Sequence, residues 1–96
     1  MNNITVDYKR LGWDQASQWD KIGEELGEVV KAIIQGNPVE VIRESLDVME
    51  TMWTHLNMVA DDYNINLKKL VEEHDQKLKD KGYLKVGELE NETIGT

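Results

Sequence analysis

The apolar residues of this chain recur at helical spacing, and nowhere do they alternate with polar residues as in a half-buried strand. From about residue 13 to residue 35 they form one stripe, which predicts a helix with a single apolar face. The stripe consists of Ile22, Leu26, Val29 and Ile33. Gly36 follows it and predicts a left-handed stop.

A second helix is predicted from Pro38 to about Asp61. Asn37 supplies a cap, Pro38 suits the first helical position, and Glu40 can complete a capping box. The apolar residues of this helix spread over more than half of its circumference, wider than one neighbouring helix covers. They are Val41, Ile42, Leu46, Val48, Met49, Met52, Trp53, Leu56 and Val59. We therefore expect this helix at the centre of a bundle that a second subunit completes.

A shorter helix is predicted over residues 67–81, with Asn64 or Asn66 as its cap and Gly82 as its stop. Residues 1–12 predict irregular structure or a short turn of helix. The expected fold is therefore all-α, a helical bundle whose four-helix-bundle-like core is completed by oligomerisation. We expect a single domain over residues 1–84 and a polar tail over residues 85–96.

The balance of charges excludes several classes of partner. The chain has 96 residues, 19 of them acidic and 11 basic, and a net charge of −8. This charge argues against binding to duplex nucleic acid or to an anionic membrane surface. Cysteine is absent, which excludes disulfides, a thiol nucleophile and a cysteine-based zinc site. Without a long apolar span or a signal-peptide core, the default expectation for localisation is the cytoplasm.

Two acidic motifs carry the candidate chemistry. Glu25 and Glu28 are three residues apart in the first long helix, as are Glu44 and Asp47 in the second. On a helix this spacing puts the β-carbons of a pair about 5–6 Å apart, so both carboxylates reach one small ion. If the helices are antiparallel neighbours, four carboxylates converge. Such oxygen ligands suit Mg²⁺, with Mn²⁺ as a second candidate.

The plainer interpretation is that these acids form solvated helix faces. The third helix has that character, because Lys68 and Lys69 stand four residues before Glu72 and Glu73. Glu44, by contrast, has Glu40 four residues before it and Asp47 three residues after it, with no cation at either spacing. Clustered like charges are unfavourable on a helix, and a bound cation would offset the repulsion. The first long helix distinguishes less well between a metal site and a solvated face, because its lysines can pair with its acids.

Other chemistries find no support in the motifs. A di-iron carboxylate bundle needs Glu-x-x-His on two helices, but His55 and His74 follow Met52 and Val71 at that spacing. The chain also has no Gly-x-Ser-x-Gly motif, no Walker A loop and no glycine-rich dinucleotide fingerprint.

The run from Gln18 to Leu84 resembles the MazG-like, all-α nucleoside triphosphate pyrophosphohydrolases, relatives of dimeric dUTPases and of phosphoribosyl-ATP pyrophosphohydrolase. The matching elements are Lys21, Glu24-Glu25-Leu26-Gly27-Glu28, Glu44-Ser45-Leu46-Asp47, and Lys77, Lys79 and Lys81 before Gly82. Two positions depart from the family pattern. Leu46 stands where the family usually has a small residue, and Lys81 is the closest match to a family arginine.

The resemblance implies hydrolysis of a nucleotide between its α- and β-phosphates, with release of pyrophosphate. It implies Mg²⁺ on the four acidic ligands and a water oriented or deprotonated by Glu24 or Glu25. The substrate-binding candidates are Lys21, Lys77 and Lys81 for the phosphates, and Trp13 and Trp19 for stacking on a base.

Two alternatives remain open: a phosphoribosyl-ATP-type enzyme, and a non-catalytic helical oligomer that acts as an interaction module. The expected partners are a nucleotide and further copies of the chain in a dimer or tetramer, with no duplex nucleic acid and no membrane. No base-reading motif is evident, so the sequence does not choose among nucleotides.

Overall fold

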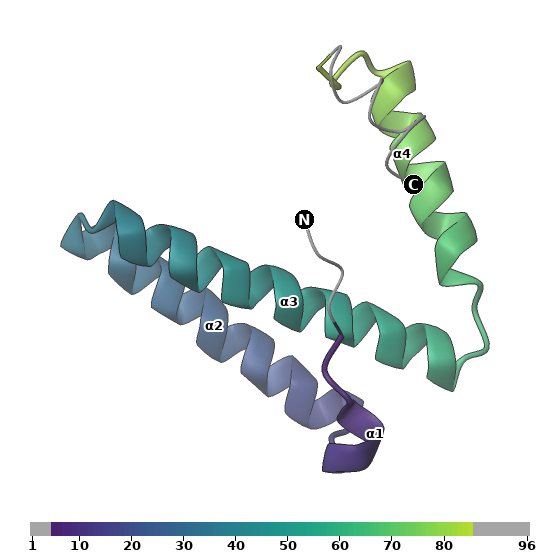
Figure 1. The fold of residues 1–96 in the computed structure, drawn as a ribbon, viewed down its shortest axis with the longest axis horizontal. Helices are drawn as coiled ribbons and strands as arrows, with labels where there is room; N and C mark the ends of the chain where they lie inside the picture. Colours follow the sequence, from purple (N-terminus) through teal and green to yellow (C-terminus); the bar gives the residue numbers. More distant parts are fainter. Residues whose placement is uncertain (1–4, 86–96) are drawn as a thin grey trace. The chain divides into compact units, whose positions relative to one another are not determined.

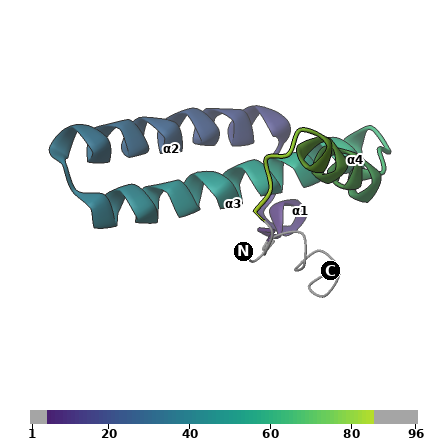
Figure 2. The ribbon, with the colours of Figure 1, turned by 90° about the horizontal axis from the view of Figure 1, so that it is seen from above.

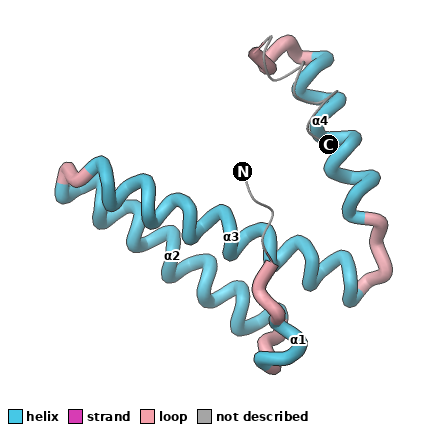
Figure 3. The backbone as a smooth tube through the Cα atoms, in the orientation of Figure 1, coloured by secondary structure: helices cyan, strands magenta, loops and turns pink. Residues whose placement is uncertain are grey.

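The computed structural model describes residues 5–85 and divides the chain into two compact units, Met1–Ile65 and Asn66–Thr96. The first unit holds helices α1 (Tyr8–Leu11), α2 (Gln15–Gln35) and α3 (Pro38–Asp62), and the second holds α4 (Leu67–Asp80) (Figure 1). Residues 5–85 contain no strand, which confirms the all-α class (Figure 3). Within this range, no helix is both long enough and apolar enough to cross a membrane.

Helices α2 and α3 form an antiparallel hairpin and lie side by side along their length (Figures 1 and 2). The predicted turn between them is confirmed. Gly36 adopts a left-handed φ of 68°, and its N–H donates to carbonyls of the last turn of α2. The side chain of Asn37 accepts from the N–H of Glu40 at 3.2 Å, and Pro38 opens α3. The Glu40 carboxylate pairs with Arg43 at 2.7 Å instead of completing a capping box.

Helix α2 begins at Gln15, two residues later than the apolar pattern predicts. Asp14 is extended, and its carboxylate accepts from the N–H of Ser17 at 2.9 Å. In return, the N–H of Asp14 donates to the Ser17 hydroxyl at 3.2 Å. These reciprocal bonds satisfy N–H groups that a helix start leaves unpaired. The backbone bond from Ser17 also lowers the pKa of Asp14.

The described core is small and lies between α2 and α3. Its buried apolar residues are Ile22, Ala32 and Met58, and its buried polar residues are Gln18, Thr51 and Thr54. Much of the predicted apolar surface remains open to solvent in the single chain. On α2 it includes Leu26, Val30, Ile33 and Ile34, and on α3 it includes Ile42, Leu46, Met49, Met52 and Leu56. We call these nine residues the open apolar face. Large exposed apolar surfaces commonly mark interaction sites.

The N-terminal segment is fastened to the C-terminal half of α3. The Tyr8 hydroxyl donates to the Asp61 carboxylate at 3.2 Å and to the Asn57 carbonyl at 3.4 Å. Lys9 forms an ion pair with Asp61 at 2.6 Å. These hydrogen bonds, from Lys9 first and then from Tyr8, lower the pKa of Asp61. These contacts therefore hold the segment that leads into α2 against α3.

The second unit follows the prediction closely. The side chain of Asn66 accepts from the N–H of Lys69 at 3.2 Å and caps α4. The helix ends at Asp80, with Lys81 as its C-cap and Gly82 in the left-handed region at a φ of 69°. The predicted tail over residues 85–96 falls outside the described residues except for its first position. The single domain over residues 1–84 stays a prediction.

Candidate metal centre and adjoining pocket

Three of the predicted metal ligands come together on the hairpin. Glu25 comes from α2, and Glu44 and Asp47 come from successive turns of α3. One carboxylate oxygen from each lies within 4.8 Å of the other two. Two ligands on opposite sides of a bound Mg²⁺ lie about 4.2 Å apart, so small side-chain rotations bring these oxygens to coordination distance. We call these three residues the acidic cluster.

The electrostatics of the acidic cluster favour a cation. Burial, followed by the charge of Asp47, raises the pKa of Glu44, and the nearby Glu28, Glu25 and Glu40 raise it further. Arg43, which stands four residues before Asp47, pairs with Glu40 at 2.7 Å. Lys21 pairs with Glu25 at 3.5 Å, so the acidic cluster sets three carboxylates against one ammonium group, and a divalent ion would relieve the remaining repulsion.

Glu28 lies one turn beyond Glu25 but is not part of the acidic cluster. Its carboxylate is half exposed and lies 4.0 Å from the ammonium group of Lys31. It still contributes to the raised pKa of Glu44, so it lies within electrostatic reach of the site. Its predicted role as a fourth ligand stays a prediction.

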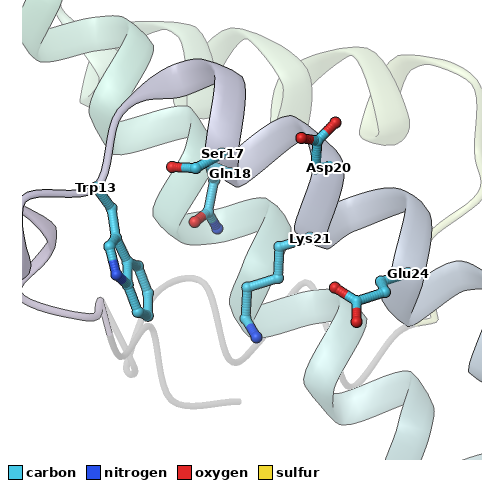
Figure 4. Close-up of a pocket in the computed structure, with 6 residues that line it drawn as sticks. All are labelled: Trp13, Ser17, Gln18, Asp20, Lys21 and Glu24. Atoms are coloured by element: carbon cyan, nitrogen blue, oxygen red, sulfur yellow. The ribbon is translucent and has the colours of Figure 1, made fainter.

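Lys21 connects the acidic cluster to an open pocket. Its ammonium group lies 3.5 Å from Glu25, whose side chain is only 19% exposed. Lys21 also lines a pocket of about 340 Å³ on the N-terminal half of α2 (Figure 4). The pocket is lined by Trp13, Ser17, Gln18, Asp20, Lys21 and Glu24. Glu24, a candidate base, therefore faces the pocket and not the acidic cluster.

The remaining substrate-binding candidates fall in different places. Trp13 forms part of the pocket wall, whereas Trp19 is 65% exposed and its ring lies 5.9 Å from that of His55. Lys77 and Lys81 belong to the second unit. Lys77 lies in the last turn of α4, and the Lys81 ammonium group lies 5.8 Å from the centre of the Tyr83 ring.

The sequence reasoning missed three pocket residues, Ser17, Gln18 and Asp20, of which only Gln18 is buried. Its side chain is 1% exposed, and its amide N–H donates to the carbonyl of Thr51 at 2.9 Å. A signal was present, because Gln18 stands four residues before Ile22 and so continues the apolar stripe of α2. A polar residue in phase with a buried stripe needs a hydrogen-bonding partner inside the fold.

The acidic cluster predicts a pH-dependent response to metal. At pH 7.5, Mg²⁺ should raise the melting temperature, because a ligand at a hundred times its Kd stabilises the folded state by about 2.7 kcal/mol. Since the pKa of Glu44 is raised, protons compete for it at mildly acidic pH, and the Mg²⁺-induced shift should shrink as the pH falls toward 5. Differential scanning calorimetry at matched ionic strength measures this. A flat response to both Mg²⁺ and Mn²⁺ at pH 7.5 would contradict the metal site.

Comparison with known proteins places these residues in a family. No curated protein and no solved structure matches the chain. The model of the phosphoribosyl-ATP pyrophosphohydrolase family, however, matches residues 9–78. The matched region includes both acidic motifs, the pocket and most of α4. The chain therefore belongs to the phosphoribosyl-ATP pyrophosphohydrolase family, within the MazG-like superfamily of all-α pyrophosphohydrolases.

Proposed function

We propose that this protein is a metal-dependent nucleotide pyrophosphohydrolase, which cleaves the bond between the α- and β-phosphates and releases pyrophosphate. The observation that carries the proposal is the acidic cluster, in which Glu25, Glu44 and Asp47 converge within 4.8 Å. Family membership supports the same chemistry. Phosphate transfer to water depends above all on charge neutralisation and positioning, which such a cluster provides through a bound cation.

The residues present fit a divalent ion with oxygen ligands. Glu25, Glu44 and Asp47 would hold Mg²⁺ or Mn²⁺, and Glu28, one turn beyond Glu25 on α2, is the further candidate ligand. When bound, such an ion neutralises phosphate charge and lowers the pKa of a coordinated water. The raised pKa of Glu44 returns toward its ordinary range when a cation is present, because the cation favours the ionised carboxylate.

Two residues of α2 have roles beside the ligands. We propose Glu24 as the base that accepts a proton from the attacking water, because it faces the pocket and stands next to Glu25 without joining the acidic cluster. Glu25 is the other candidate base, but as a metal ligand it would be the weaker base, because a bound cation favours its ionised form. Lys21 pairs with Glu25 at 3.5 Å and is placed to exchange this partner for a phosphate oxygen. Lys77 and Lys81 are proposed as further phosphate contacts.

Two substrate classes fit this chemistry equally well. One is a nucleoside or deoxynucleoside triphosphate, and the other is phosphoribosyl-ATP, after which the family is named. Both present a triphosphate whose α–β bond is cleaved in the same way. A non-catalytic helical oligomer is the remaining alternative, and the open apolar face is the observation that favours it. The same face is compatible with an oligomeric enzyme, and we propose at least a dimer.

Pyrophosphate release distinguishes these possibilities. The full chain should release pyrophosphate from at least one member of a panel of the eight common triphosphates and phosphoribosyl-ATP. Release should require Mg²⁺ or Mn²⁺ and should stop in EDTA. A preference for phosphoribosyl-ATP over every simple triphosphate selects the second substrate class. If folded protein releases no pyrophosphate from any nucleotide with either metal, the enzymatic proposal fails and the oligomer remains.

A further inference from the structure

The last two residues of α3, Asp61 and Asp62, are acids at a helix end that disfavours them. The C-terminus of a helix carries partial negative charge, so carboxylates there do not stabilise α3 itself. Both bind groups of the N-terminal segment instead. Asp61 accepts from the Tyr8 hydroxyl at 3.2 Å and pairs with the Lys9 ammonium group at 2.6 Å. Asp62 accepts from the side-chain amide of Gln15 at 2.7 Å. We call Asp61 and Asp62 the aspartate pair.

The contacts of the aspartate pair lie on both sides of Trp13 in the sequence. Tyr8 precedes Trp13 by five residues, and Gln15 follows it by two. The N–H of Trp13 donates to the Tyr8 carbonyl at 3.0 Å, and Gly12 between them turns the chain at a left-handed φ of 71°. The backbone of Trp13 is thus bonded to one residue that the aspartate pair binds and lies two residues from the other. The position of Trp13 therefore depends on these carboxylates.

Trp13 lines the pocket at the end away from the acidic cluster. In the view of Figure 4, Trp13 and Glu24 lie at opposite ends of the pocket, with Lys21 between them. Ser17 and Glu24 are seven residues apart, which is about 10 Å along α2. Trp13 is 36% exposed and offers an aromatic face for a planar base. The two ends can therefore take different parts of one nucleotide, the base at Trp13 and the reacting phosphate with its water at Glu24.

We propose that the aspartate pair positions Trp13 for substrate binding, with Asp61 as the principal positioning residue because it binds two groups of the N-terminal segment. Neither carboxylate touches the substrate. The inference rests on the proposed function, which places the reacting phosphate near Glu24 and the acidic cluster. A contact to the base, remote from the reacting bond, contributes equally to the substrate complex and the transition state. Its loss therefore raises KM and leaves kcat unchanged.

Asp61→Ala tests the inference, because alanine removes both contacts and is favourable in the last turn of a helix. In pyrophosphate release by the full chain, KM should rise about fivefold with kcat unchanged, the size expected when an exposed ion pair and its hydrogen bond are lost. The indole N–H signal of Trp13 in the ¹⁵N-labelled protein without nucleotide, assigned with Trp13→Phe, should shift. The signal of Trp53, in the middle of α3, should stay in place.

Tyr8→Phe and Tyr63→Phe form a matched pair of milder variants. Each removes one hydroxyl near the end of α3, but only that of Tyr8 donates to Asp61. Tyr8→Phe should move the Trp13 signal and raise KM about twofold. Tyr63→Phe, whose side chain is 68% exposed, should do neither.

Nucleosides separate this inference from the proposed activity, because they need neither metal nor hydrolysis. In EDTA, at least one of adenosine, guanosine, cytidine and uridine should shift the Trp13 signal, with a Kd about fivefold higher in Asp61→Ala. The inference fails if Asp61→Ala leaves the Trp13 signal or the KM unchanged, if it lowers kcat and not substrate affinity, or if no nucleoside moves the signal. Pyrophosphate release with such a result removes only this inference, whereas nucleoside binding at Trp13 without release removes only the proposed activity.

Discussion

Glu44→Gln should abolish metal-dependent pyrophosphate release while leaving the helical hairpin intact. The substitution keeps the size of the side chain and removes the charge at the centre of the acidic cluster, where Glu25 and Asp47 lie within 4.8 Å. Changes to groups that only support a metal ligand already reduce metal affinity or activity by about 10–100-fold. Loss of a ligand should therefore lower kcat/KM by at least about a hundredfold. Steady-state kinetics with circular dichroism of the same samples measures both effects.

Glu40→Gln is the matched control for this variant. It removes one carboxylate from the same helix, one turn earlier, where Glu40 pairs with Arg43 outside the acidic cluster. Its activity should stay within a few-fold of the unchanged protein. The two variants should also differ in EDTA, where Glu44→Gln should raise the melting temperature because it relieves like-charge repulsion. If Glu44→Gln keeps the same activity as Glu40→Gln and the unchanged protein, the acidic cluster is not the catalytic site.

Leu46→Asp should convert the dimer or larger oligomer that we propose to a monomer. Leu46 is 52% exposed in the single chain and belongs to the open apolar face of α3. If a second subunit covers this face, an aspartate there is buried without a partner, at a cost of about 3 kcal/mol or more. Association should weaken by more than about a hundredfold. Sedimentation equilibrium over a range of protein concentrations measures the change.

Leu46→Met is the appropriate comparison, because it preserves an apolar side chain of similar volume. It should assemble as the unchanged protein does. If Leu46→Asp also keeps the original oligomeric state, another surface holds the subunits together and the central position expected for α3 is wrong. An unchanged protein that sediments as a monomer at all concentrations would refute the dimer itself.

The helix boundaries were predictable because they depend on residues close to them in the sequence. Gly36, Asn37 and Pro38 each act on the backbone within a few residues, and all three act in the structure as expected. The convergence of Glu25 with Glu44 was also foreseeable, since two helices joined by so short a turn must run antiparallel. The start of α2 was missed because Ser17 replaces the usual Glu or Gln in its capping box.

The pocket was harder to foresee than the acidic cluster. Trp13 precedes α2 and lines the pocket from outside the helix, a placement that no periodicity encodes. The role of Gln18 depends on which face of α2 meets Thr51, which is a tertiary contact between distant positions. Helical spacing shows which residues share a face, but the partner of that face follows from packing alone.

The short turn at Gly36 has a consequence for how this protein can vary. Because the hairpin is continuous helix on both sides, the distance along the chain from Glu25 to Glu44 sets their alignment across the two helices. One residue inserted into either helix between them would rotate one ligand by about 100° relative to the other. The number of residues between Glu25 and Glu44 is therefore constrained, and this part of the chain can accept substitutions far more readily than insertions or deletions.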